Sequence, residues 1–327
     1  MRIFPIFIPH LGCPFNCVYC DQLIITKSKI PSVQSISENV KKFCENNRLE
    51  EKEIAFFGGT FTKLSKEMQQ AYFDAVNEHK NLMSGIRIST RPDSIDQEIL
   101  DFCKNNNVRT IELGIQSFDD SVLITTKRGY ISQTAVESCN VIKENNFTLG
   151  IQLMPGLPGF NSKSLKKTIE TTIKLKPDFV RIYPTIVLKN TELENWFKAG
   201  KYSPLTLKES IVIVTEMISR FRAKKIKIIK VGLHSDIDKK NIIAGPYHQS
   251  FGELVRSEML KVEILNNFKN KTLEISSSDI SLFKGFNSKM LEEIKIEKKL
   301  MKIPIKINKN LKKDNFIFTN AQPDENW

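Results

Sequence analysis

The sequence predicts an α/β fold built on a parallel sheet, because short apolar runs alternate with helical segments along most of the chain. At least six strand-then-helix units follow one another, without hairpin turns between the strands. Strands joined through helices form right-handed crossovers, which make the strands parallel. An open doubly wound sheet and a partial or full (β/α) barrel are both compatible with this pattern.

The first strand is predicted at residues 2–8, where β-branched and aromatic residues are concentrated. Similar short runs predict further strands at residues 54–57, 86–88, 110–113, 149–153, 179–182 and 226–231. Helical periodicity, with a Ser cap at 37 and an Asp cap at 96, predicts the helices between them. The clearest helices are expected at residues 37–46, 65–80 and 207–222.

The composition is that of a globular protein. Of the 327 residues, 40% are hydrophobic and 26% are charged, which excludes a mostly disordered chain. No run approaches the ~18 apolar residues of a membrane span, and the short apolar start does not resemble a secretory signal. We therefore expect no membrane association and a cytoplasmic protein, whose six cysteines stay reduced.

The length predicts one large domain and a smaller one. We expect the barrel core at residues 1–235 and a small Lys-rich extension at residues 236–327. Residues 261–313 contain 13 Lys and 6 acidic residues, a net +7 out of the chain's +12. Such a segment is compatible with a solvated surface or with a surface that binds RNA.

Unusual residues follow the predicted strands one after another. A cysteine cluster follows the first strand, Gly58-Gly59-Thr60 the second and Ser89-Thr90-Arg91 the third. The pattern continues with Gln116-Ser117, Met154-Pro155-Gly156 and Tyr183-Pro184. In a parallel sheet the strands' carboxyl ends share one rim, where ligands bind. The sequence therefore predicts a binding site at this rim.

The strongest motif is Cys13-x3-Cys17-x2-Cys20 on the loop after the first strand. Three thiolates this close can reach one metal centre, and in a reducing compartment they select zinc or an iron–sulfur cluster. A closed zinc site and a complete ferredoxin-type cluster each require four ligands. Three cysteines without a fourth indicate a cluster with one open iron, which suits catalysis.

The other candidate ligands are weaker. Cys44, Cys103 and Cys139 fall within predicted helices among apolar neighbours, which is typical of small buried side chains. His10 is a possible fourth ligand, but a polar residue at the end of the strand is the more ordinary interpretation.

The cysteine loop resembles the signature of the radical S-adenosylmethionine (radical SAM) superfamily, including an aromatic residue, Tyr19, before the third cysteine. Residues 1 to about 256 resemble one branch, proteins similar to the radical SAM module of the Elongator catalytic subunit. We interpret the chain as a short bacterial branch that lacks the acetyltransferase domain, since about 70 residues follow the last matching stretch. The stretches that carry this resemblance are IPHLGCPFNCVYC, FFGGTFT, STRPDSID, IELGIQSFDD, GIQLMPGLPG, VRIYPTIV and GPYHQSFGELV.

The resemblance implies a radical SAM barrel and an enzyme with two cofactors, a [4Fe–4S] cluster and S-adenosylmethionine. Cys13, Cys17 and Cys20 would bind three irons, and the amino and carboxylate groups of S-adenosylmethionine would bind the fourth. Arg128 would pair with that carboxylate. The other residues expected at the cofactor are Gly58, Gly59 and Thr60 for the amino group, Ser89 and Gln116 for the ribose, Met154 and Tyr183 for the adenine, and Glu112 and Gln152.

The implied function is reductive cleavage of S-adenosylmethionine to a 5′-deoxyadenosyl radical, with electrons from a flavodoxin- or ferredoxin-type donor. Modification of an RNA base, with tRNA as the partner, is the first hypothesis. A small metabolite such as a tetrapyrrole is the second, and a non-catalytic cluster-bearing RNA-binding module is the third. The chain departs from the family pattern at Tyr130, where we expect His, and at Lys230, where we expect Arg.

Overall fold

A computed structural model of the chain describes residues 2–46, 51–233, 237–267, 271–284, 290–299, 303–312, 316–320 and 322–323. Internal contacts divide the chain into two compact units. The larger consists of Met1–Ser210 and Arg220–Tyr247, and the smaller of Ile211–Ser219 and His248–Trp327. The domain boundary expected between residues 235 and 236 stays a prediction.

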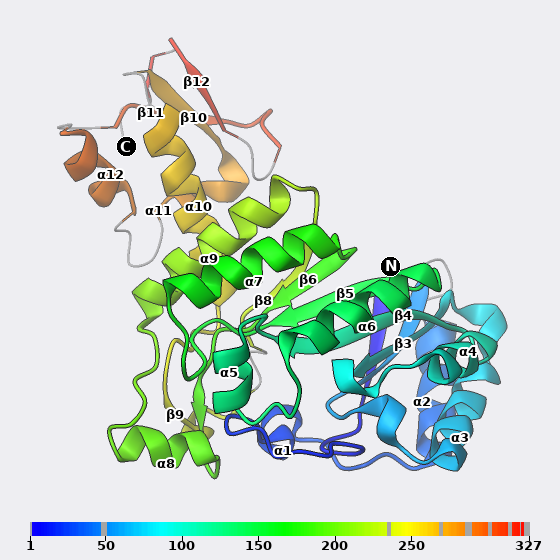
Figure 1. The fold of residues 1–327 in the computed structure, drawn as a ribbon. Helices are drawn as coiled ribbons and strands as arrows, with labels where there is room; N and C mark the ends of the chain where they lie inside the picture. The colour runs from blue at the N-terminus through cyan, green and yellow to red at the C-terminus, as the bar shows by residue number, and fades with distance from the viewer. Residues whose placement is uncertain are drawn as a thin grey trace. The chain divides into compact units, whose positions relative to one another are not determined.

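The larger unit contains a seven-stranded sheet in the order β1-β2-β3-β4-β5-β6-β8, and every neighbouring pair is parallel (Figure 1). The strands are β1 (Arg2–Phe7), β2 (Lys52–Phe57), β3 (Gly85–Thr90), β4 (Val108–Gln116), β5 (Thr148–Leu153), β6 (Phe179–Ile182) and β8 (Lys227–Val231). Because the spatial order follows the chain order without a reversal, the sheet has no switch point of the doubly wound kind. The twist of the sheet curls it into part of a barrel. Within the described residues the edge strands β1 and β8 do not pair, so the barrel is a half-barrel. The predicted partial barrel is confirmed.

Helices connect successive strands of the sheet. They are α1 (Gln22–Thr26), α2 (Val33–Asn46), α3 (Lys66–Asn77), α4 (Gln97–Asn105), α5 (Asp120–Thr125), α6 (Ser132–Glu144), α7 (Ser162–Leu175), α8 (Glu192–Lys198) and α9 (Leu207–Arg222). Cys44, Cys103 and Cys139 are buried in α2, α4 and α6, which confirms that they are core residues. Burial raises the pKa of Cys103 and of Cys139 to about 12.

One predicted detail of the secondary structure is wrong, and one strand pair was not predicted. Helix α2 begins at Val33 rather than at Ser37, because Ser32 supplies the cap: its Oγ accepts from Ser35 N at 3.2 Å. A small antiparallel pair, β7 (Val187–Leu188) with β9 (Ile242–Ala244), is also present and was not expected. Such short pairings between distant segments leave no periodic pattern in the sequence.

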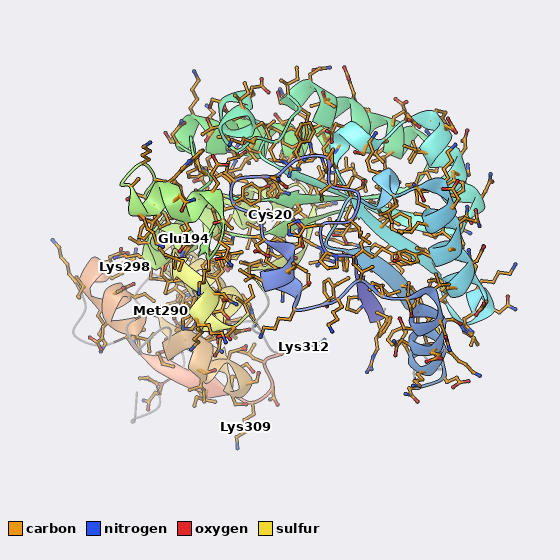
Figure 2. All side chains as sticks on the ribbon, turned by 90° about the horizontal axis from the view of Figure 1, so that it is seen from below. Cys20, Glu194, Met290, Lys298, Lys309 and Lys312 are labelled. Atoms are coloured by element: carbon orange, nitrogen blue, oxygen red, sulfur yellow. The ribbon has the colours of Figure 1, made fainter. Side chains whose placement is uncertain are left out.

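The smaller unit has its own core around a three-stranded sheet in the order β11-β10-β12. Its elements are α10 (Phe251–Asn267), β10 (Thr272–Ser276), α11 (Ile280–Lys284), α12 (Met290–Lys298), β11 (Ile305–Asn308) and β12 (Phe316–Thr319). Polar and apolar residues alternate over residues 302–307 as in a strand. Strand β11 is found there from Ile305, and Lys302 itself lies outside the described residues. Lys298 and Lys309 project away from this unit's elements, whereas Met290 belongs to its core (Figure 2).

Candidate active site at the carboxyl end of the half-barrel

The cysteine loop follows β1 and folds back on itself through short backbone hydrogen bonds. Cys13 N donates to His10 O at 3.2 Å, and Cys20 N donates to Cys17 O at 3.0 Å. Val18 is buried between the cysteines, in an apolar cluster against which Cys17 and Cys20 pack. The loop is therefore anchored by its apolar residues, which leaves the three sulfurs on one side.

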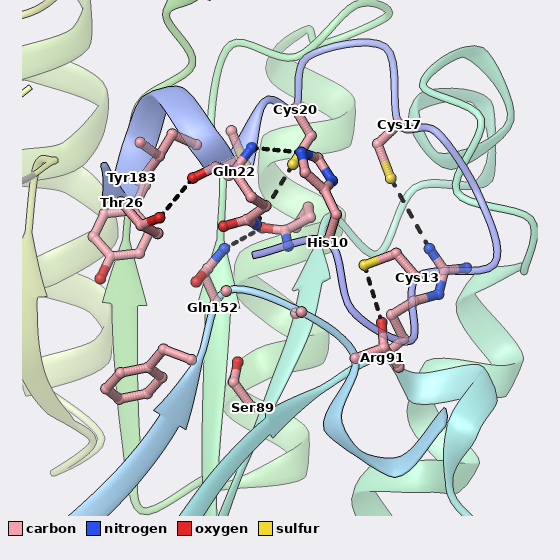
Figure 3. A pocket seen from close by; sticks show the side chains of 18 of the residues that line it. His10, Cys13, Cys17, Cys20, Gln22, Thr26, Ser89, Arg91, Gln152 and Tyr183 are labelled. Carbon is pink, nitrogen blue, oxygen red and sulfur yellow. Dashed lines mark hydrogen bonds between the residues drawn. The ribbon is translucent and has the colours of Figure 1, made fainter. Parts of the chain in front are cut away.

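The three sulfurs each contact a different polar group. Cys13 Sγ lies 3.4 Å from Thr60 Oγ1, and Cys20 Sγ accepts from Gln22 Nε2 at 3.5 Å (Figure 3). Burial is the main cause that raises the pKa of Cys20 to about 12, and the nearby Cys17 and Cys13 raise it further. Three thiolates in this place would repel one another unless a positively charged centre joined them.

A cluster and a single metal ion require different arrangements of the three sulfurs. In a tetrahedral zinc site with Zn–S bonds of about 2.3 Å, sulfurs lie only about 3.8 Å apart. Within the described residues no three His, Cys, Asp or Glu side chains form a group that could hold one metal ion. An iron–sulfur cube accepts one thiolate on each iron, so its ligands need not converge on one point.

Two glycines let the loop after β2 lie directly against the cysteine loop. Gly58 has a φ of +97°, a backbone conformation that residues other than glycine rarely adopt. A Cβ added to Gly59 would lie 2.3 Å from Leu11 O and 2.6 Å from Ile8 O, so only glycine fits there. Thr60 N donates to Leu11 O at 2.8 Å and completes the contact.

At the end of β4 the backbone is bent so that an amide side chain faces the cavity. Gln116 has a φ of +73°, and the β4–β5 register shifts between Gly114 and Gln116. Such a bulge re-aims a side chain, and a non-glycine residue in this conformation costs about 1–3 kcal/mol. Gln152 Nε2 donates to Gln116 Oε1 at 3.1 Å, and Met154 N donates to Gln116 O at 2.9 Å. Three predicted site residues are thus held together.

An unpaired carboxylate inside a barrel is costly, so Glu112 needs a partner. It belongs to a buried ion network inside the half-barrel that was not expected from the sequence. Glu112 accepts from Arg87 Nη1 at 2.6 Å and from Arg181 Nε at 2.7 Å. Arg87 Nε also donates to Glu53 Oε2 at 2.9 Å, and Arg181 Nη1 contacts Tyr183 OH at 3.4 Å. The network joins β2, β3, β4 and β6 and contains two acids and two bases.

The sequence carries a signal for this network. Arg87 lies between Ile86 and Ile88 within a strand, and Arg181 lies between Val180 and Ile182. A charged residue inside a buried strand needs a partner, because an unpaired buried charge is very costly. The signal reveals that partners exist but not which residues they are.

Arg128 is buried and its N–H groups all have acceptors. Nη1 donates to Cys17 Sγ and to Tyr19 OH, each at 3.1 Å, and Nε donates to Tyr130 OH at 3.2 Å. Nη2 donates to Tyr130 OH at 3.1 Å and to Gly114 O. None of these partners, among the described residues, is a carboxylate.

All thirteen predicted site residues line one cavity of about 380 Å³ at the rim (Figure 3), a volume typical of small-molecule sites. They are Cys13, Cys17, Cys20, Gly58, Gly59, Thr60, Ser89, Glu112, Gln116, Arg128, Gln152, Met154 and Tyr183. Their individual roles stay predictions. The cavity also includes residues that were not singled out, such as Gln22, Phe57 and Arg181.

His10 lines the same cavity but is not positioned as a metal ligand. Its Nε2 accepts from Gln22 N at 2.8 Å, so the lone pair that a metal would need is occupied (Figure 3). This contact favours the ordinary interpretation of His10 as a polar residue at the end of β1.

The model of the Radical SAM superfamily matches residues 7–172, just over half of the chain. The chain belongs to this family. The Radical_SAM C-terminal domain matches residues 177–261. Members of this family are enzymes, so family membership confirms the prediction that the chain is an enzyme.

The radical SAM protein is similar to tRNA uridine(34) acetyltransferase of Methanocaldococcus infernus, with 27% identity over 76% of this chain and 48% of that protein. Elongator complex protein 3 of Homo sapiens is 25% identical over 73% of this chain and 46% of that protein. The chain therefore spans about half the length of these relatives. The predicted resemblance to the Elongator branch is confirmed.

Solved structures show the same fold. Archaeal Methanocaldococcus infernus Elp3 superposes with a TM-score of 0.66 at 21% identity, over 80% of this chain and 63% of that one. Coproporphyrinogen III oxidase (HemN) from Escherichia coli gives a TM-score of 0.51 at 19% identity, over 68% and 52% of the two chains. None of the described helices is long and apolar enough to cross a membrane.

Proposed function

We propose that Cys13, Cys17 and Cys20 hold a [4Fe–4S] cluster and that S-adenosylmethionine occupies the cavity beside it. Family membership implies both cofactors. The observation that carries the assignment to these residues is that all three sulfurs open onto the one cavity that contains every residue expected at S-adenosylmethionine.

When bound, the cluster supplies the electron that cleaves S-adenosylmethionine into methionine and a 5′-deoxyadenosyl radical. The chain's own residues bind and orient. The backbone of Gly58, Gly59 and Thr60 offers carbonyl oxygens to an amino group, since each carbonyl oxygen can accept two hydrogen bonds. Gln116 and Ser89 offer polar groups to ribose hydroxyls.

The remaining walls of the cavity suit a purine. Met154 and Tyr183 provide apolar surface for adenine, and Gln152 keeps Gln116 in place. Burial raises the pKa of Tyr183, so its phenol stays neutral. Glu112 is held between two guanidiniums and gives this end of the cavity a rigid floor.

The proposed substrate is a base in tRNA. Two facts support it: relatives of the chain are named tRNA uridine(34) acetyltransferase, and the smaller unit is rich in Lys. The match to those relatives covers about half of their length, so acetyl transfer is not carried over. A cytoplasmic location and a flavodoxin- or ferredoxin-type electron donor belong to the same proposal.

The cofactor proposal predicts that Cys17→Ala abolishes the brown colour and the iron of anaerobically reconstituted protein. It also predicts that the variant forms no 5′-deoxyadenosine from S-adenosylmethionine and dithionite. Cys44→Ala is the matched control, because Cys44 is buried in α2 outside the cavity, and it should keep both properties. Colourless wild-type protein with zinc on the thiols would contradict the proposal.

Nucleoside mass spectrometry of tRNA and rRNA from a deletion strain tests the substrate. Loss of one modified nucleoside supports the tRNA proposal. Accumulation of a metabolite such as a tetrapyrrole, with unchanged nucleosides, would select a small-molecule substrate instead. Cluster-containing protein that forms no 5′-deoxyadenosine would indicate a non-catalytic module.

A further inference from the structure

Cys17 differs from the other two cysteines in the charge around its sulfur. Arg128 Nη1 lies 3.1 Å from Cys17 Sγ. Arg91 Nη1 lies 3.9 Å from the same sulfur (Figure 3). Both guanidiniums are buried. A charge-assisted N–H donor strengthens a hydrogen bond to a thiolate.

The two other sulfurs have neutral neighbours. Cys13 Sγ faces the hydroxyl of Thr60, and Cys20 Sγ faces the amide of Gln22. Positive charge at the trio is therefore concentrated on one side of the loop, at Cys17.

The direction of the Arg128 guanidinium is set by its surroundings. The Tyr130 hydroxyl accepts from both Nε and Nη2 and lies 3.0 Å from Ile115 O, to which it can donate. With Gly114 O on Nη2, this leaves Nη1 directed at Cys17. Tyr130 is thus a positioning residue, and it is one of the two places where this chain departs from the family pattern.

Arg91 is held separately and contributes a weaker contact. Its Nε and Nη2 pair with the two carboxylate oxygens of Asp93 at 2.9 and 2.8 Å, which neutralises much of its charge. Arg128 has no carboxylate partner among the described residues. Arg128 is consequently the dominant cation at Cys17.

We propose that Arg128, positioned by Tyr130, donates an N–H···S hydrogen bond to the Cys17 thiolate and raises the reduction potential of the bound cluster. One-electron reduction makes the cluster more negative, so a nearby cation and N–H donor stabilise the reduced state more than the oxidised one. The inference rests on the proposed function, since it requires the cluster on Cys17.

The test compares Arg128→Gln and Tyr130→Phe with wild type, as anaerobically reconstituted full-length chains without S-adenosylmethionine. Dithionite titration with redox mediators, followed by EPR of the reduced cluster, gives the midpoint potential. We expect a more negative midpoint in both variants, with the larger shift in Arg128→Gln. Lys127→Gln is the matched control, because it removes a positive charge from the residue directly before Arg128. Lys127 is exposed and pairs with Glu192, so its replacement should leave the midpoint potential unchanged.

Unchanged midpoints in both variants would overturn the inference. If Arg128→Gln fails to assemble the cluster, Tyr130→Phe decides, because it removes only the hydroxyl and keeps the ring. Weaker binding of S-adenosylmethionine by Arg128→Gln, with an unchanged midpoint, would assign Arg128 to the carboxylate instead. Wild-type protein without a cluster signal would be a failure of the proposed function, which is a distinguishable result.

Discussion

At the scale of single residues, the stability of the half-barrel interior depends on four charged side chains that neutralise one another. Glu53, Arg87, Glu112 and Arg181 carry two negative and two positive charges, and hydrogen bonds of 2.5–3.0 Å join them. A buried ion pair contributes little compared with an apolar pair of the same shape. Removing one member is costly, because it leaves a buried charge without compensation.

Glu112→Gln tests this dependence. We expect the free energy of unfolding to fall by about 3–5 kcal/mol, because both Arg87 and Arg181 lose an anionic partner. Chemical denaturation followed by circular dichroism measures the change. Glu98→Gln is the control, since its pair with Lys66 is exposed on both sides, and it should cost at most about 1 kcal/mol. Similar losses in the two variants would refute a special role for the buried network.

At the scale of elements, α2 shows how a helix start is decided. Its buried residues Ile36, Val40 and Cys44 are spaced by four, so they lie on one face of the helix, and this pattern is visible in the sequence. Ser32, Ser35 and Ser37 are all chemically suitable caps, so the period alone does not select among them. The structure selects Ser32, whose hydroxyl accepts from Ser35 N.

Ser32→Ala should therefore destabilise the protein by about 1 kcal/mol through loss of the cap. Ser37→Ala should cost less than Ser32→Ala, because Ser37 lies within the helix and its hydroxyl loses a hydrogen bond to an exposed partner, Glu78. Thermal and denaturant unfolding of the two variants gives the comparison. A larger loss in Ser37→Ala would restore the predicted helix start.

At the scale of the whole molecule, charge is unevenly distributed. The segment 261–313 carries +7 of the total +12. In the smaller unit Lys261 and Lys295 pair with glutamates. Lys298, Lys309 and Lys312 form no ion pair with any described residue, and Lys309 and Lys312 are exposed. Unpaired lysines on a surface attract polyanions, and this property is what the tRNA proposal requires.

Replacing Lys298, Lys309 and Lys312 together by Gln should weaken tRNA binding by the full-length chain. The dependence of log K on log salt should become shallower by about 0.9 for each phosphate that the variant no longer neutralises. Fluorescence anisotropy over a series of salt concentrations measures both quantities. The charge-matched control replaces Lys104, Lys163 and Lys166, which are exposed in the larger unit. Equal effects of the two triple variants would show that only net charge matters.

The fold was predictable where its causes are local. Strand β6 and helix α9 occupy the residues predicted for them, because apolar periodicity is a property of neighbouring residues. The order of strands and helices then implied a parallel sheet. The choice between a doubly wound sheet and a half-barrel was not local, since it depends on which strands pair.

The same division holds for the site. That Cys13, Cys17 and Cys20 share one loop follows from the sequence, because eight residues contain all three. Two other contacts are visible only in the folded chain. Arg128, 111 residues after Cys17, donates to its sulfur, and Arg181 contacts Glu112 across 69 residues. These contacts depend on the register and curl of the sheet, which arise from packing among all its strands and are not encoded near any one of them.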